Sequence, residues 1–199
     1  MGGMLALGDL RADGDLAAAR RSLLEAVPRD AAQARERDRI VAWIDAHPRD
    51  AHLRSNLAGH LTASAIVVDH AGERVLLTHH RKLGRWLQLG GHCDGEANLA
   101  RAALLECVEE SGIEDLVIDP RPLDLDIHRI PARPGEPEHD HLDTRFVVHA
   151  PLGAVEVLSE ESLELRWFRL DELERLETDE SVRRLARSWT RRARGEAGA

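Results

Sequence analysis

The pattern of apolar positions changes near residue 60. Before it, the segments 15–27 and 29–48 carry apolar residues at helical spacing, and each is followed or closed by a proline, Pro28 or Pro48. A short third helical piece is expected at 49–57. We therefore predict an N-terminal helical extension over residues 1–58, packed on the main domain because no low-complexity linker separates the two.

From residue 60 onward the apolar runs become short and rich in β-branched residues. Two runs flank a glycine-centred turn and predict a hairpin, and a third leads into a glycine pair; they read "LTASAIVVD", "RVLLTHH" and "WLQLGG". Later candidate strands read "DLVID", "LDLDIHRI", "HLDTRFVVHA" and "LELRWFRL". Because strands and helices mix without strict alternation, the pattern favours an α/β class of the α+β type, a layered fold with a mixed sheet.

Helical spacing returns at three places in this region. Alanine and leucine recur helically from about 98 to 110, and Gly112 follows where a left-handed cap would end the helix. The stretch "DELERLE" predicts a short helix, and "DESVRRLARSWTRRARG" predicts a basic C-terminal helix within residues 178–199. Residues 59–177 are then the main domain.

Composition limits the class of protein. A chain of 199 residues with 43% hydrophobic and 32% charged residues fits one globular domain with an appendage. It has no apolar run near the roughly 20 residues that cross a bilayer, and its start lacks an export leader, so we expect a cytoplasmic protein without membrane partners. The formal charge of -9 argues against general nucleic-acid binding, so a phosphate ligand would need a bound cation.

Three carboxylates share one face of the helix at 98–110. Residues turn by about 100° each on an α-helix, so Glu106, Glu109 and Glu110 project to the same side. Hard cations such as Mg²⁺ bind one or two protein carboxylates together with water and substrate phosphate oxygens. The alternative is an ordinary solvated acidic face. The preceding glycine pair, Gly90-Gly91, allows close backbone approach and favours the metal site.

This constellation resembles the box of the Nudix hydrolase family. With Gly91 as the first box glycine, the register is kept by Glu106, Cys107, Glu109, Glu110, Gly112 and Ile113. The stretches "WLQLGGH" and "LRWFRLDEL" also resemble family segments, so the resemblance covers about residues 61–176. It implies a Nudix-type α/β/α sandwich with a mixed sheet, to which the N-terminal helices are added.

Two positions depart from the family pattern. Ala97 stands where the box has glutamate, with Glu96 one place early, and Leu105 stands where the box has an arginine that holds the carboxylates in position. Glu96 could take the missing role through a small loop adjustment. For the arginine, Arg101 or a distant basic residue is the candidate substitute.

The resemblance implies hydrolysis of a diphosphate linkage in a nucleoside-diphosphate-linked small molecule, with Mg²⁺ or alternatively Mn²⁺ as cofactor. By position, Glu106 and Glu109 are the catalytic candidates. The candidate metal ligands are Glu106, Glu109, Glu110, the Gly90 carbonyl and Glu96. A catalytically weak binding or regulatory module of the same fold is the main alternative, and an isoprenoid-diphosphate isomerase is a weaker one. The N-terminal helices could serve contact with another protein or a homodimer.

A second informative stretch is "HDHLDTRF". As a strand it places His139, His141, Asp143 and Arg145 on one face, suited to a transition metal or to a substrate phosphate, unless it is a hydrated strand end. Further substrate-binding candidates are His79 and Arg81 before the glycine turn and His92 after it. In contrast, His60, His70 and His149 belong to no motif and are interpreted as structural.

Overall fold

The computed structural model describes residues 3–159 and 162–196. Its strands are β1 (Leu5–Ala6), β2 (Gly59–Val68), β3 (Arg74–His80), β4 (Arg85–Leu87), β5 (Leu89–His92), β6 (Val117–Ile130), β7 (His139–His149) and β8 (Ser162–Arg169). The α-helices are α1 (Leu16–Glu25), α2 (Ala31–Ala46), α3 (Leu99–Ser111) and α4 (Glu180–Ala193), and two short 3-10 helices are η1 (Leu7–Asp9) and η2 (Leu170–Arg175).

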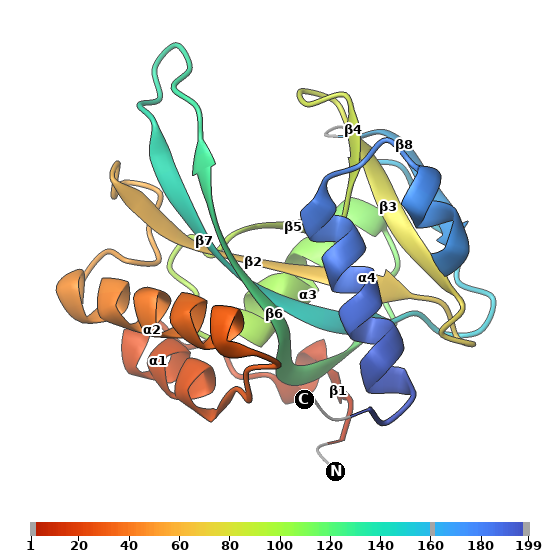
Figure 1. The fold of residues 1–199 in the computed structure, drawn as a ribbon, viewed down its shortest axis with the longest axis horizontal. Coiled ribbons are helices and arrows are strands. Elements are labelled where there is room, and N and C mark those ends of the chain that lie inside the picture. Colours follow the sequence, from red (N-terminus) through yellow and green to blue (C-terminus); the bar gives the residue numbers. More distant parts are fainter. Residues whose placement is uncertain (1–2, 160–161, 197–199) are drawn as a thin grey trace.

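The strands form one mixed sheet with helices on both faces, which confirms the expected α/β/α sandwich (Figure 1). The sheet order among the described residues is β1-β6-β7-β2-β3-β4, with β5 beside β2 and β8 beside β3. Strand β2 runs parallel to β7 and antiparallel to β3 and β5. In Figure 1, α4 crosses the front of the sheet and α3 lies behind it.

Strand β2 is the centre of the sheet, and every one of its residues is buried. Its odd-numbered residues from Leu61 to Val67 join the core shared with α1, α2 and α3, whereas Ile66 and Val68 join the core under α4. Because alternate residues of a strand point to opposite faces, His60, Thr62 and Ser64 lie on the α4 face as well. That face is therefore apolar at one end of β2 and polar at the other.

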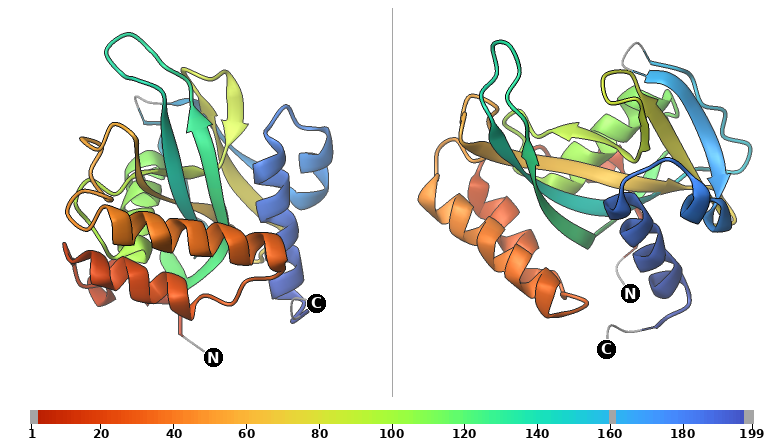
Figure 2. Two further views of the ribbon diagram at one scale, coloured as in Figure 1. Left: turned by 60° about the vertical axis from the view of Figure 1, so that its left-hand side comes forward. Right: turned by 45° about the horizontal axis from the view of Figure 1, so that its top comes forward.

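The N-terminal helices contact the sheet. They run side by side near one end of the sheet (Figure 2), and α2 contacts β6. The Gln33 side chain of α2 donates to the Leu125 carbonyl and accepts from the Leu125 N–H, both at 2.8 Å. The expected third helical piece at 49–57 is wrong, because this segment forms successive turns.

Several boundaries differ from those expected from the sequence. The runs "DLVID" and "LDLDIHRI" form the single strand β6, whose pairing with β7 shifts register between Asp119 and Asp124, where two prolines lack N–H donors. The stretch "WLQLGG" divides into β4 and β5, and "DELERLE" forms η2 instead of an α-helix. The pairing of β1 with β6 gave no signal in the sequence.

The C-terminal helix is α4, as predicted, and it covers the second core with Val182, Leu185 and Trp189. The loop between β6 and β7 projects beyond the body of the molecule (Figure 2). Among the described residues, none of the helices has both the length and the apolar character needed to span a bilayer.

Candidate metal and substrate site

Helix α3 carries two of its three carboxylates, Glu106 and Glu110, against the glycine pair of β5. The helix starts at Asn98, whose side chain accepts from the Arg101 N–H, and it ends at Gly112 in the left-handed conformation, with φ 67°. Its apolar side contacts β2 and β5. Glu106 and Glu110 are half-buried, and Glu109 is exposed.

The glycine pair of β5 fits against two of these carboxylates. The Gly90 N–H donates to Glu110 Oε2 at 3.0 Å. A Cβ atom at residue 91 would lie 2.4 Å from Glu106 Oε2, and one at residue 90, where φ is 146°, would lie 2.3 Å from Ser64 Cβ. Glycine at position 91 therefore lets the Glu106 side chain of α3 lie against β5, and glycine at position 90 lets β5 lie this close to Ser64 of β2. The glycine pair and these two carboxylates form a cradle, and carboxylate oxygens are donors of the kind that suits a hard divalent ion.

Glu96 has a different set of contacts. Its Oε1 accepts from the N–H groups of Asp13 and Asn98, both at 2.9 Å, and Arg101 Nε lies 3.5 Å from its Oε2. The carboxylate thus ties the N-terminal segment to the start of α3. These contacts explain why glutamate is useful at position 96 independently of any metal.

Two arginines have contacts with acidic residues in or beside the box. Arg101 pairs with Glu96 as described. Arg54, in the turns before β2, donates from Nε to Asp94 Oδ1 at 2.7 Å and also contacts Oδ2. These hydrogen bonds, followed by the charges of Asp94 and Glu106, raise the pKa of Arg54 above its usual value. The negative charge of the box residue Glu106 therefore acts on Arg54. No local sequence motif indicated this interaction.

The candidates His79 and Arg81 lie at the β3–β4 turn. The His79 ring stacks on Trp86, with ring centroids 5.1 Å apart, and Trp86 meets Phe168 edge-on at 4.8 Å. The Arg81 guanidinium donates to the Ser162 carbonyl at 3.2 Å. These contacts put the pair beside β8, on a part of the sheet other than the one that holds the histidines of β7.

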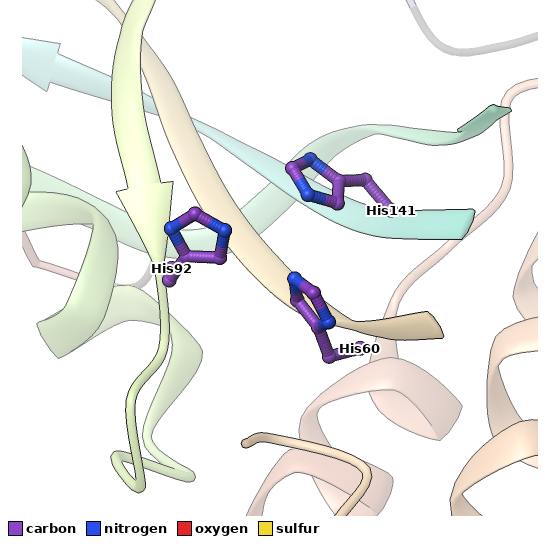
Figure 3. A group of neighbouring side chains, drawn as sticks. All are labelled: His60, His92 and His141. Carbon is purple, nitrogen blue, oxygen red and sulfur yellow. The ribbon is translucent and has the colours of Figure 1, made fainter. Parts of the chain in front are cut away.

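The strand β7 does place its four candidates on one face, but they divide into two groups. His139 and His141 lie near the start of the strand, with their Nε2 atoms 3.2 Å apart. Parallel pairing sets His60 of β2 beside His141, and β5 brings His92 beside Thr62. Figure 3 shows His60, His92 and His141 gathered around a shared space. One ring nitrogen from each lies within 4.8 Å of those of the other two.

These imidazoles are neutral near pH 7. Burial lowers the pKa of His92 to about 4 and that of His141 to about 2, and the charge of Arg54 adds to the effect at His92. Burial also lowers the pKa of His60, although its hydrogen bond with the Asn56 carbonyl opposes this. Each ring therefore keeps one nitrogen lone pair, which is the form that binds metals.

Asp143 and Arg145 belong instead to a buried network of charges. Asp143 accepts from Ser64 at 2.8 Å and from Arg145 Nε at 2.7 Å. Arg145 is 2% exposed and also pairs with Asp126 at 2.9 Å and with Asp124 at 3.5 Å. The expectation that Asp143 is available to a metal and Arg145 to a phosphate therefore needs correction, because their polar atoms face one another inside the protein.

Two elements outside the sheet complete this charge network. Arg184 of α4 donates to Asp124 at 2.8 Å and to Asp126 at 2.6 Å, and Arg29, just before α2, also pairs with Asp124. Three arginines therefore balance three aspartates, which satisfies charges that would be costly to bury alone. The network ties α4 and the N-terminal extension to one face of the sheet.

His60 is the residue that the sequence interpretation missed. The sequence indicates a structural role for His60, yet this residue is 2% exposed and stands at the centre of the histidine cluster, with ring centroids 4.9–5.0 Å from those of His92, His139 and His141. No spacing rule connects it to His141, because their proximity depends on the parallel pairing of β2 with β7. A histidine at the start of a predicted strand was the available signal.

Comparison with known proteins supports the fold. A model of the NUDIX domain matches residues 59–189. Among solved structures, an Ap4A hydrolase from C. elegans in a binary complex aligns with a TM-score of 0.56 at 19% identity, covering 68% of this chain and 98% of its own. The NUDIX domain of Shewanella oneidensis NrtR complexed with ADP ribose aligns with a TM-score of 0.54 at 15% identity, covering 70% and 92%. At such identities the structural likeness shows the fold alone. No curated protein matches the sequence.

Proposed function

The chain belongs to the Nudix hydrolase family, and we propose that it hydrolyses a diphosphate linkage in a nucleoside-diphosphate-linked substrate with Mg²⁺ or Mn²⁺ as the ion. The observation that carries this proposal is the fit of the glycine pair to α3. Gly90 donates to Glu110, and Gly91 leaves the space that the Glu106 carboxylate fills. Oxygen donors of this kind suit a hard divalent cation.

The proposed roles follow this arrangement. Glu109 and Glu110, with the Gly90 carbonyl, would hold the ion, and Glu106 either joins them or accepts a proton from the attacking water. When bound, the ion would neutralise part of the negative charge of the diphosphate. Water attacks phosphorus, the bridging P–O bond breaks, and the proton goes to a carboxylate, which gives two phosphorylated products. We assign Glu96 to holding the start of α3, in line with its backbone partners.

Substrate contacts are proposed from the residues that flank this cradle. His92 directly follows Gly91, and Arg54 is exposed and feels the charge of Glu106. His79 and Arg81, beside Trp86, are proposed for the part of the substrate beyond the diphosphate. Asp143 and Arg145 are assigned to the buried network instead of the substrate.

The test is a panel of nucleotide sugars, dinucleoside polyphosphates and ADP-ribose, each incubated with Mg²⁺ or Mn²⁺ and with separation of the products. We expect turnover that requires the divalent ion and falls at least ~100-fold in Glu110→Gln, because metal-held charge stabilisation is lost in the transition state. The matched control is Glu114→Gln, an exposed glutamate beyond the end of α3. Saturable binding without turnover would instead favour the regulatory module.

A further inference from the structure

We propose that His60, His92 and His141 form a second metal site, which binds a borderline-soft divalent transition-metal ion of the Zn²⁺ type. The three rings come from β2, β5 and β7 and surround one space (Figure 3). Their donor atoms are all nitrogen, whereas the donors on α3 are all oxygen. Imidazole suits zinc and its neighbours among the transition metals, and carboxylate suits magnesium, so the two sites differ in the ion that they select.

The hydrogen bonds of the rings set their lone pairs. His60 Nδ1 lies 3.3 Å from the Asn56 carbonyl oxygen, and His139 Nδ1 lies 2.8 Å from that of Pro137. A carbonyl only accepts, so Nδ1 donates in both rings, and in the neutral ring of His60 Nε2 therefore keeps the lone pair. Metal-bound histidines characteristically donate their other N–H to a carbonyl or carboxylate in this way.

His60 supplies an independent sign of a missing ligand. Its Nε2 is buried and has no hydrogen-bond partner among the described residues. Leaving a buried acceptor unsatisfied costs roughly 1–3 kcal/mol, so such atoms are uncommon in native proteins. A cation between the rings would satisfy this lone pair together with those of His92 and His141.

The geometry needs little adjustment. Tetrahedral zinc with Zn–N bonds of about 2.0–2.1 Å separates its nitrogens by roughly 3.4 Å. The ring nitrogens already lie within 4.8 Å of one another. Small rotations of the histidine side chains are therefore enough. His139, whose Nε2 is 3.2 Å from that of His141, is placed as a further donor or as an outer-shell partner.

One positive charge lies near this site. Arg54 lowers the pKa of both His60 and His92, which shows that its charge reaches their rings. Its guanidinium is paired with Asp94, whose negative charge acts on the same two rings in the opposite direction. The pair is close to neutral overall, so it does not forbid a cation held by three lone pairs.

An ion held by three imidazoles keeps a position open for water or a substrate oxygen. The two sites share strand β5, because His92 is two residues from Gly90. Binding of the ion does not rest on the proposed hydrolysis, since it requires only the three rings. The metal affinity and the diphosphatase activity can therefore fail or succeed separately.

The experiment measures Zn²⁺ binding to the metal-stripped full chain by competition with a chromophoric chelator, with the metal content of the dialysed protein as a second readout. We expect one Zn²⁺ per chain and, in His60→Gln, an affinity at least ~100-fold lower, since outer-shell partners alone are worth roughly 10–100-fold. The matched control is His70→Gln, an exposed histidine in the β2–β3 turn, which should bind like the wild type.

Two further variants keep the test decisive. If His60→Gln does not fold, His92→Gln carries the same expectation, because that ring is only partly buried. Glu110→Gln should keep full Zn²⁺ affinity, since the carboxylate is not a member of the cluster. The proposal is overturned if the wild type binds no stoichiometric Zn²⁺, or if the histidine variants bind it as tightly as the wild type.

Discussion

The α3 cradle and the histidine cluster meet neighbouring residues of β5, yet they are built in opposite ways. Glu106, Glu109 and Glu110 lie within one helical turn or so of one another, so a single helix creates most of the cradle. His60, His92 and His141 come from three strands and meet only when the sheet forms. A site built on one helix can be predicted from the spacing of its residues along the sequence. A site built from several strands depends on how those strands pair in the sheet.

The surroundings of the two sites differ as well. The carboxylates of α3 stand at the surface or are half-buried, while the histidine side of the sheet continues into the buried network around Arg145. We therefore expect substitutions of the α3 carboxylates to change activity with little loss of stability. Substitutions in the network should mainly change stability.

The largest effect is expected for Arg145→Met. It would leave the buried Asp124 and Asp143 and the half-buried Asp126 with fewer positive partners, and breaking a buried pair costs roughly 3–5 kcal/mol in the free energy of unfolding. Urea denaturation measures the change. The control is Arg20→Met, which removes an exposed pair with Asp45 worth about 0–1 kcal/mol. Equal effects in the two variants would contradict the distinction between buried and surface charges.

Acid should weaken the same network. Burial alone would raise the pKa of Asp126, but the hydrogen bond from His128 and the charges of Arg145 and Arg184 hold it well below the usual value. Because the folded pKa is lower than the unfolded one, this stabilisation is present above about pH 4 and is lost as the pH falls further.

Urea midpoints between pH 3 and 7 should therefore separate wild type from Asp126→Asn. The variant should be less stable at neutral pH by roughly 1–3 kcal/mol, because hydrogen-bonded buried charges are lost. The difference should shrink as the pH falls below about 4. A constant difference across this range would remove Asp126 as a source of the pH dependence.

A third prediction concerns the cradle itself. In Gly91→Ala the new Cβ would lie 2.4 Å from Glu106 Oε2, so the carboxylate must move. We expect metal-dependent turnover to fall by about tenfold or more, since misplaced ligands lose productive geometry. Steady-state kinetics measures this, and Zn²⁺ affinity should be unchanged. Gly8→Ala, at a position with open space, is the control. Full activity in Gly91→Ala would show that the position of Glu106 is not critical.

The smallest effects should come from the missing box arginine. Arg54 already places positive charge near Glu106, so Leu105→Arg should leave turnover nearly unchanged. Arg54→Gln should lower it several-fold, whereas Arg49→Gln, another exposed arginine of the same turns, should not. Faster turnover in Leu105→Arg would mean that the missing arginine limits catalysis and that Arg54 does not replace it.

The sequence by itself determined the features that depend on neighbours along the chain. Helix α3, its glycine end and the face shared by its three glutamates follow from a 3.6-residue period, and the alternation along β7 placed its polar residues on one face. Resemblance to a known family extended these local features to the layered fold. The prediction of a third helical piece was wrong, because residues 49–57 form turns. Arg54 lies in these turns and donates a hydrogen bond to Asp94.

Tertiary structure alone decided which polar residues meet. Asp143 and His141 are two residues apart on the same face of β7, but Asp143 joins Arg145 and His141 joins His60. The division arises because the two strands beside β7 place aspartate and hydroxyl side chains next to Asp143 and histidine side chains next to His141. Pairing between strands far apart in sequence is set by the packing of the whole sheet, and no local pattern of residues specifies it.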